Sequence, residues 1–219
     1  ATRESSWTAL LRPRTLSAMK FRRVLALLTA AAALVAGLAP LSVFATRPIR
    51  VACLGDSITA GSGLEHPSRQ SYPAQLGELL GDAYDVRNFG VSGATLIVEG
   101  DKPYRTQPAF VDALRFAPDI VVIALGTNDT KPQNWAHRDR FVHHYIRLIG
   151  QISEMPETPR IFICRPMPAW PPSGWGISPA IIEHELPPLL AEVARSERVT
   201  LIDLFTPLRD RAELAPDHV

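Results

Sequence analysis

The sequence has little of several features, and each shortage excludes a class of protein. Two cysteines in 219 residues are too few for a disulfide scaffold or a cysteine-rich zinc site. No charge sign dominates, because 23 Lys and Arg residues face 22 Asp and Glu residues, and this balance disfavours a nucleic-acid binder with a basic face. Repeats and low-complexity tracts are lacking as well. The length and the 46% hydrophobic content indicate one folded domain of ordinary size, or at most two small ones.

Several functional motifs are also missing. Without G-x-S-x-G the chain is not an ordinary α/β-hydrolase, and without G-x-G-x-x-G or a P-loop a dinucleotide or nucleotide-phosphate site has no support. His143 and His144 are neighbours on a predicted helix, where successive side chains point about 100° apart. We therefore interpret them as solvated and not as metal ligands. His66, His137 and His184 have no companion spacing, which favours structural or exposed roles.

Basic residues are concentrated in residues 1–45, where six bases face a single acid. Met19 opens a short basic segment, and an apolar run rich in Ala and Leu follows from Val24 to Val43. The run ends in Val43-Phe44-Ala45, with small residues at the −3 and −1 positions of a cleavable site. These three parts predict a secretory signal peptide, so that residues 46–219 form a secreted or periplasmic domain.

Two other interpretations of the leader stay open. About 20 apolar residues can span a bilayer, so an uncleaved leader would anchor the protein to a membrane. The run can also be a buried helix of the domain. Residues 1–18 contain no Met and no hydrophobic periodicity, and we assign them no function.

The rest of the chain alternates between predicted strands and helices. The third predicted strand, 119–125, has no charge after its first residue, which is typical of a parallel sheet covered on both faces. The pattern predicts a doubly wound α/β fold with ligands at the carboxyl ends of the strands. The predicted strands are 49–54, 84–88, 119–125, 160–164 and 199–204, and the predicted helices are 71–80, 108–116, 138–154 and 179–196.

Small and polar residues follow four of these strands. Ser57 lies in Gly55-Asp56-Ser57-Ile58 after the first strand, where a helix N-terminus would favour negative charge. Gly93 follows the second strand, Asn128 the third, and Asp217 the fifth. The Ser57 and Gly93 N–H groups and the Asn128 amide would form an oxyanion hole for a Ser57 nucleophile.

These residues resemble the GDSL/SGNH hydrolases from about Ile49 to the last residue. Gly55-Asp56-Ser57-Ile58, Gly93, Gly126-Thr127-Asn128-Asp129 and Asp217 are similar to the family's blocks I, II, III and V. The resemblance implies that Ser57 is the nucleophile, that Gly93 and Asn128 complete the oxyanion hole, and that Asp217 orients a catalytic histidine. It also implies a flavodoxin-like three-layer sandwich with strand order 2-1-3-4-5, and no metal or organic cofactor.

Each motif also has a simpler interpretation. Gly-Asp-Ser is a common turn after a strand, and Asn128 or Asp129 can act as a helix N-cap. Ser92 is expected to be a turn hydroxyl. Cys53 and Cys164 fall in different predicted strands with another strand between them, which favours two core thiols over a disulfide or a catalytic role.

The family's last block has the pattern Asp-x-x-His. Asp217 supplies its aspartate, His218 and Val219 fill the variable places, and the histidine would be residue 220. His218 adjoins Asp217 directly, so its side chain leaves the backbone in another direction and is a poor substitute. The family's closing helix would follow this block. We therefore expect the 219-residue chain to be nearly inactive, with apolar surface uncovered beside the first strand.

Aromatic residues in the long loops bear on the substrate. Tyr104, Trp135, Trp170 and Trp175 are expected either at a pocket rim, where they suit the apolar faces of sugars, or packed against the body. The segment from Lys131 to Trp135 resembles the carbohydrate-deacetylating branch of the family, including sialate O-acetylesterase-like proteins. The sequence thus predicts an esterase acting on short acyl groups, most simply O-acetyl groups of a sugar. Two alternative functions are a lysophospholipase or thioesterase of the same family and a non-catalytic glycan-binding module.

Overall fold

The structure is a computed structural model that describes residues 47–171 and 173–214. The predicted signal peptide, Asp217 and His218 lie outside these residues. Within the described residues, no helix combines the length and the apolar character needed to cross a bilayer.

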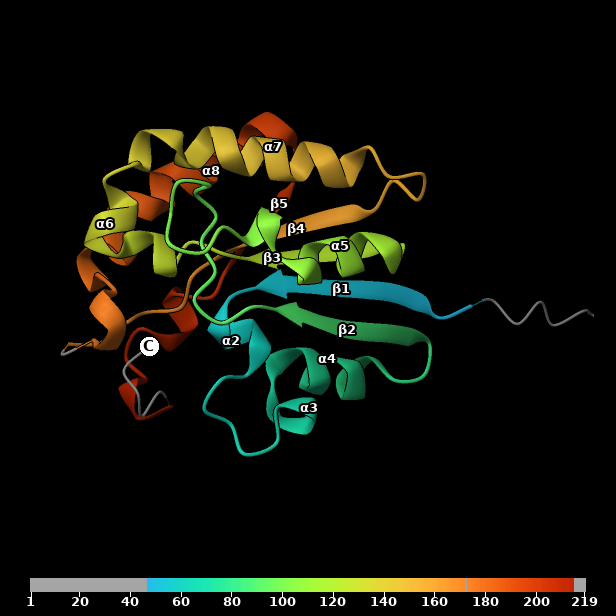
Figure 1. Ribbon diagram of the computed structural model, residues 1–219. Coiled ribbons are helices and arrows are strands. Elements are labelled where there is room, and N and C mark those ends of the chain that lie inside the picture. Colours follow the sequence, from blue (N-terminus) through green and yellow to red (C-terminus); the bar gives the residue numbers. More distant parts are fainter. Residues whose placement is uncertain (1–46, 172, 215–219) are drawn as a thin grey trace, which may run out of the picture. The chain divides into compact units, whose positions relative to one another are not determined.

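The five predicted strands form a single parallel sheet with the predicted order β2-β1-β3-β4-β5 (Figure 1). The register aligns Gly55 at the end of β1 with Gly90 of β2 on one side and with Ala124 of β3 on the other. The loops after these three strands therefore leave the same edge of the sheet. The strands are β1 (Ile49–Gly55), β2 (Tyr84–Gly90), β3 (Ile120–Ala124), β4 (Arg160–Arg165) and β5 (Thr200–Asp203).

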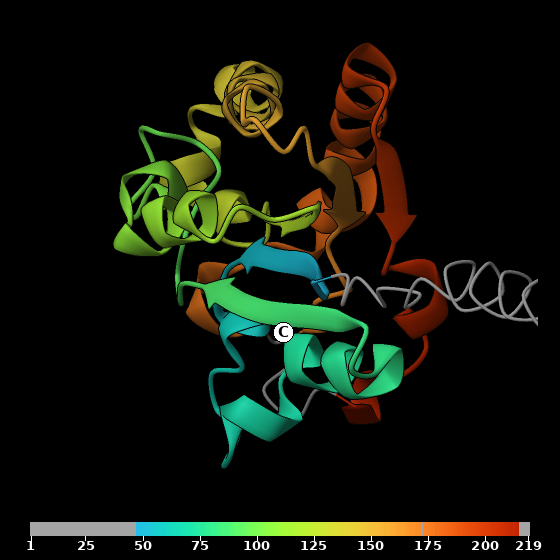
Figure 2. The same cartoon turned by 90° about the vertical axis from the view of Figure 1, so that its right-hand side faces the viewer.

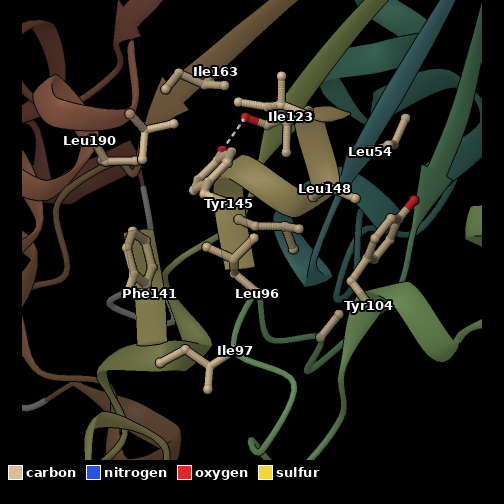
Figure 3. Close-up of a cluster of buried hydrophobic side chains, with 14 of the residues drawn as sticks. Leu54, Leu96, Ile97, Tyr104, Ile123, Phe141, Tyr145, Leu148, Ile163 and Leu190 are labelled. Atoms are coloured by element: carbon tan, nitrogen blue, oxygen red, sulfur yellow. Dashed lines mark hydrogen bonds between the residues drawn. The ribbon is translucent and has the colours of Figure 1, made fainter. Parts of the chain in front are cut away.

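Helices lie on both sides of the sheet and complete the predicted three layers. The helices α5 (Pro108–Arg115), α7 (Phe141–Ser153) and α8 (Leu186–Glu197) lie on one face, and α4 (Tyr72–Leu80) lies on the other (Figures 1 and 2). Figure 3 shows the core under the first group, where the Tyr145 hydroxyl of α7 donates to the Ile123 carbonyl of β3 at 3.4 Å. Fully buried core side chains include Leu54, Leu96, Ile123, Phe141, Tyr145, Leu148 and Ile163.

The predicted helix 179–196 begins differently from the prediction. Residues Ile181–Glu185 form a π-helix, and α8 starts only at Leu186. Pro187 and Pro188 explain this, because they lack the N–H groups that would bond to the carbonyls of the preceding turn. The Arg165 guanidinium donates to the Glu183 carbonyl instead, at 3.3 Å.

Other differences concern short elements. The first turn of the predicted helix 138–154 is a 3₁₀ turn, Arg138–Arg140, and α7 follows it. Four-residue helices escaped prediction because one turn shows no periodicity. They are α2 (Ser57–Ala60), α3 (Pro67–Gln70) and α6 (Pro132–Trp135), and further 3₁₀ turns are Tyr104–Thr106, Asn128–Thr130, Gly174–Gly176, Thr206–Leu208 and Ala212–Leu214.

The expectation that β3 is covered on both faces is wrong in part. Val121 and Ile123 are buried, whereas Ile120, Val122 and Ala124 on the other face are half-buried. On that face, α4 is the longest helix among the described residues, and it packs mainly against β2. Strand β3 is therefore fully buried on one face only, whereas its neighbour β1 is buried on both faces from Val51 to Gly55.

The two cysteines have the predicted structural role. Cys53 of β1 and Cys164 of β4 are free and buried, and β3 lies between their strands. Burial raises the pKa of both thiols to about 12, so they stay protonated and unreactive at neutral pH.

Candidate active site

Ser57 is the first residue of α2 and follows β1 directly. The Asp56 carboxylate accepts from the Ile58 N–H at 3.0 Å and so caps the turn that holds Ser57, which is half-buried. The turn lies tightly against β2, since a Cβ on Gly90 would come within 2.2 Å of the Ala60 nitrogen. A helix of four residues has little macrodipole, so the N–H groups of this turn, and not its dipole, are what it offers to an anion.

Gly93 lies in the loop after β2 with a φ of 79°, a left-handed conformation that glycine adopts without strain. The loop is tied to β1 because the Val91 N–H donates to the Gly55 carbonyl at 2.9 Å. Within the described part of the chain, the N–H groups of Ser57 and Gly93 donate to no protein acceptor. Both are therefore available to a ligand oxygen.

Asn128 begins the 3₁₀ turn after β3 and is 5% exposed. Its Nδ2 donates to the Ala94 carbonyl at 3.2 Å, which places the amide beside the residue that follows Gly93. An amide group has two N–H bonds, so the second one remains free for an oxyanion. The alternative in which Asn128 caps a helix is wrong, because Thr127 holds the cap position and makes no side-chain cap bond.

Asp129 is a site residue that the sequence analysis assigned only as a possible helix cap. It is fully buried, and its two oxygens accept from the N–H groups of Ile97 at 2.7 Å and Leu96 at 3.0 Å. This carboxylate joins the loop after β3 to the loop that carries Gly93. Burial raises the pKa of Asp129 to about 7, and the nearby Asp56 charge contributes to this rise. The two hydrogen bonds from Ile97 and Leu96 lower the pKa but do not outweigh burial.

The raised pKa of Asp129 predicts a pH-dependent stability. The folded carboxyl keeps a proton that the unfolded one has released, so the free energy of unfolding falls as pH rises through about 7. Between pH 5 and pH 8, we expect the unfolding free energy of Asp129→Asn to decrease by about 1–3 kcal/mol less than that of the parent. Urea unfolding at pH 5, 6.5 and 8 measures this.

Two other groups affect the pH dependence of the unfolding free energy, both in the parent and in Asp129→Asn. Asp56, whose pKa burial raises to about 6, adds to the fall, and His144, whose pKa burial lowers, opposes it. The exposed Asp112→Asn on α5 is the control and should keep the parent slope. Identical slopes for Asp129→Asn and the parent would show that Asp129 is ionised throughout this range.

A cavity of about 40 Å³ lies next to the Ser57 turn, with both neighbours of Ser57 in its wall. The second Asp56 oxygen, Oδ2, is buried without a hydrogen-bond partner among the described residues. Most of the remaining wall is apolar. The cavity is lined by Asp56, Ile58, Tyr72, Ala124, Thr127, Pro166, Met167 and Leu204.

The aromatic residues of the loops divide into buried and exposed ones. Tyr104 is fully buried and donates its hydroxyl to the Phe89 carbonyl at 2.7 Å, and Trp135 is 6% exposed, so a rim position is wrong for both. Trp170 is half-buried and donates to the Arg209 carbonyl at 3.1 Å. Trp175 is 82% exposed. Their packing depends on distant partners that local sequence does not reveal.

The histidines also differ from expectation at one position. His144 is 7% exposed and its Nδ1 accepts from the Val98 N–H at 3.2 Å, so it is not solvated as predicted, whereas His143 is exposed. Across the residues that the structure describes, no three His, Cys, Asp or Glu side chains lie close enough to hold a metal ion. The predicted triad partner Asp217 lies outside these residues.

Comparison with known proteins gives consistent matches. Residues 53–219 match the model of the GDSL-like lipase/acylhydrolase family. The chain is 42% identical to an acetylxylan esterase of Xylanibacter ruminicola, over 71% of this chain and 36% of that protein, so it spans about a third of that relative's length.

Solved structures agree on the fold. A protein of Agrobacterium tumefaciens provisionally named an arylesterase is 25% identical, with a TM-score of 0.57 over 70% of this chain and 82% of that one. A carbohydrate acetylesterase of Sinorhizobium meliloti is 24% identical, with a TM-score of 0.52 over 70% of this chain and 83% of that one.

Proposed function

Since the chain belongs to the GDSL-like lipase/acylhydrolase family, we propose that it is a serine esterase that removes acetyl groups from a carbohydrate. The observation that carries the proposal is the meeting of three strand-end loops around Ser57. The hydrogen bonds from Asn128 to Ala94 and from Val91 to Gly55 hold the three loops together. This brings one hydroxyl and three N–H donors to one edge of the sheet.

In the proposed reaction, the Ser57 hydroxyl attacks the carbonyl carbon of the acetyl ester. The negative charge that forms on the carbonyl oxygen is stabilised by the N–H groups of Ser57 and Gly93 and by the Asn128 amide. The sugar oxygen leaves with a proton, and acetyl-Ser57 remains. Water then attacks this ester, releases acetate and restores Ser57. A histidine oriented by Asp217 would move the protons, as the family resemblance predicts.

The cavity beside Ser57 supports a short acyl group. Its volume of about 40 Å³ and its apolar wall of Ile58, Ala124, Met167 and Leu204 suit a methyl group, whereas a fatty acyl chain would need a much longer tunnel. The size of this cavity favours an acetylesterase over a lysophospholipase or a long-chain thioesterase.

A carbohydrate as the alcohol is supported by Trp175. This side chain is 82% exposed on the loop after β4, at the same edge as Ser57. Its backbone has a φ of 63°, which costs a non-glycine residue about 1–2 kcal/mol. The loop is held by the Ser178 N–H, which donates to Thr130 Oγ1 at 3.0 Å. Such an exposed indole offers an apolar face to a sugar ring, and the similarity to an acetylxylan esterase favours xylan. Export by the predicted signal peptide would bring the enzyme to such a polymer.

The test of this function compares ester substrates that differ in their acyl group and in their alcohol, with the full-length natural protein as the enzyme. We expect acetate release from acetylated xylan, and a kcat/KM for p-nitrophenyl acetate at least about 100-fold above that for the decanoate. Equal or faster hydrolysis of the decanoate would identify a lysophospholipase or thioesterase instead. Binding of xylo-oligosaccharides without hydrolysis of any ester would identify a glycan-binding module.

A further inference from the structure

The peptide bond between Ser92 and Gly93 carries one of the three proposed oxyanion donors, the Gly93 N–H. The other end of this peptide is the Ser92 carbonyl, whose oxygen accepts a hydrogen bond from the Lys102 ammonium at 3.0 Å. The lysine stem lies along the same turn, since a Cβ on Gly93 would be 3.9 Å from the Lys102 Cδ. A cation is therefore bonded to the same peptide group that offers its N–H to the substrate oxygen.

The backbone of Lys102 is fixed where its side chain can make this bond. The Lys102 carbonyl accepts from the Thr95 N–H at 2.9 Å, and the Tyr104 N–H donates to the Thr95 carbonyl at 2.9 Å. The turn before Lys102 is tight as well, because a Cβ on Gly100 would lie 2.6 Å from Thr95 Oγ1. The segment that carries Lys102 is thus hydrogen-bonded to the loop that carries Gly93.

A buried amide joins the same segment to the third proposed donor. Asn134 is 1% exposed, and its Nδ2 donates to the Asn128 carbonyl at 2.8 Å. Its Oδ1 accepts from the N–H of Asp101, the residue before Lys102, at 3.0 Å. The segment with Lys102 therefore connects the Asn128 turn to the loop of Gly93.

The charge of the Lys102 ammonium is not shared with a carboxylate. Within residues 47–171 and 173–214 it forms no salt bridge. A charged donor on a carbonyl oxygen draws electron density from the nitrogen of the same peptide, and consecutive hydrogen bonds strengthen one another in this way. The Gly93 N–H is then held in direction and becomes a stronger donor.

We propose that Lys102 is a positioning residue of the oxyanion hole, whose ammonium orients and polarises the Ser92–Gly93 peptide bond through the Ser92 carbonyl. In this role it acts only through Gly93. The proposal rests on the proposed function, because that function supplies the oxyanion. The charge on the substrate oxygen develops in the transition state, so the effect should appear in kcat and not in KM.

The test compares Lys102→Met with Lys102→Arg in the full-length natural protein. Methionine keeps most of the stem without the cation, and because Lys102 is exposed, the protein should stay folded. We expect Lys102→Met to lower kcat for p-nitrophenyl acetate about tenfold, less than the 10²–10³ of a lost donor, with KM within about twofold of the parent. Lys102→Arg keeps a charged donor, so its kcat should stay within about threefold of the parent.

Two further measurements separate this role from a general effect of charge. The chemical shift of the Gly93 amide nitrogen responds to hydrogen bonding at the preceding carbonyl. It should move upfield in Lys102→Met and stay near the parent value in Lys102→Arg. The loss of kcat in Lys102→Met should persist at about 1 M NaCl, where the Debye length is about 3 Å and a long-range field would be screened.

The matched control is Ser62→Ala, because the Ser62 hydroxyl hydrogen-bonds to that of Ser92 and ties the same loop without contacting the carbonyl. Its kcat should change by less than about threefold. A parent-like kcat or Gly93 shift in Lys102→Met, an equal loss of kcat in Ser62→Ala, or a loss that disappears at high salt would overturn the proposal. A parent that hydrolyses no ester would instead refute the proposed esterase function, and the Gly93 shift would still decide whether Lys102 polarises the peptide.

Discussion

In the full-length natural protein, with the histidine predicted at position 220, Ser57→Ala should reduce the kcat for p-nitrophenyl acetate by about 10⁴–10⁶, since removal of a serine nucleophile leaves only the oxyanion hole and substrate binding. The reason is that the hydroxyl on the turn after β1 is the group we expect to form the acyl intermediate. The measurement is the initial rate with purified variant and parent, with the fold of each checked by circular dichroism.

Ser92→Ala is the matched control for this prediction. Ser92 lies on the neighbouring loop, one residue before Gly93, and its hydroxyl hydrogen-bonds to that of Ser62. Its removal should change kcat by less than about threefold, because we interpret it as a turn hydroxyl. A serine-directed organophosphonate should label Ser57 in the parent. Labelling at another serine of a folded, active protein would refute the assignment.

Asn128→Ala should lower kcat by about 10²–10³, or 2.7–4 kcal/mol of transition-state stabilisation, as the loss of single oxyanion donors does. The charge on the carbonyl oxygen develops only in the transition state, so KM should change little and kcat/KM should fall with kcat. Steady-state kinetics on p-nitrophenyl acetate separates the two parameters.

Stability must be measured beside these rates, because Asn128 also donates to the Ala94 carbonyl at 3.2 Å. Loss of that bond should cost about 0.5–1.5 kcal/mol of unfolding free energy, which leaves the protein folded. Asn128→Asp provides a second variant of equal volume, and it too lacks the donor. A kcat within a few-fold of the parent in both variants would mean that Asn128 serves only to join the two loops.

The sequence by itself determined the sheet and the places where polar residues leave it. The run of residues 120–125 contains no charge, which favours a strand in a parallel sheet that helices cover. The carboxyl ends of parallel strands lie at one edge of the sheet. Ser57, Gly93 and Asn128 follow three of these ends closely, so the sequence predicts all three at that edge. That reasoning requires only local hydrophobicity and the direction of the chain.

The tertiary structure alone decided how the loops are held and which side chains they bury. Asp129 finds its two N–H partners more than 30 residues earlier in the chain, and Tyr104 and Trp135 enter the core although their loops are polar in sequence. His144 is buried and accepts a hydrogen bond from the Val98 N–H, and the second face of β3 is only half-buried because α4 packs mainly against β2. These outcomes depend on contacts between distant segments. The free energy of such contacts comes from burial and hydrogen bonds that form only once the layers have packed, so no local pattern encodes them.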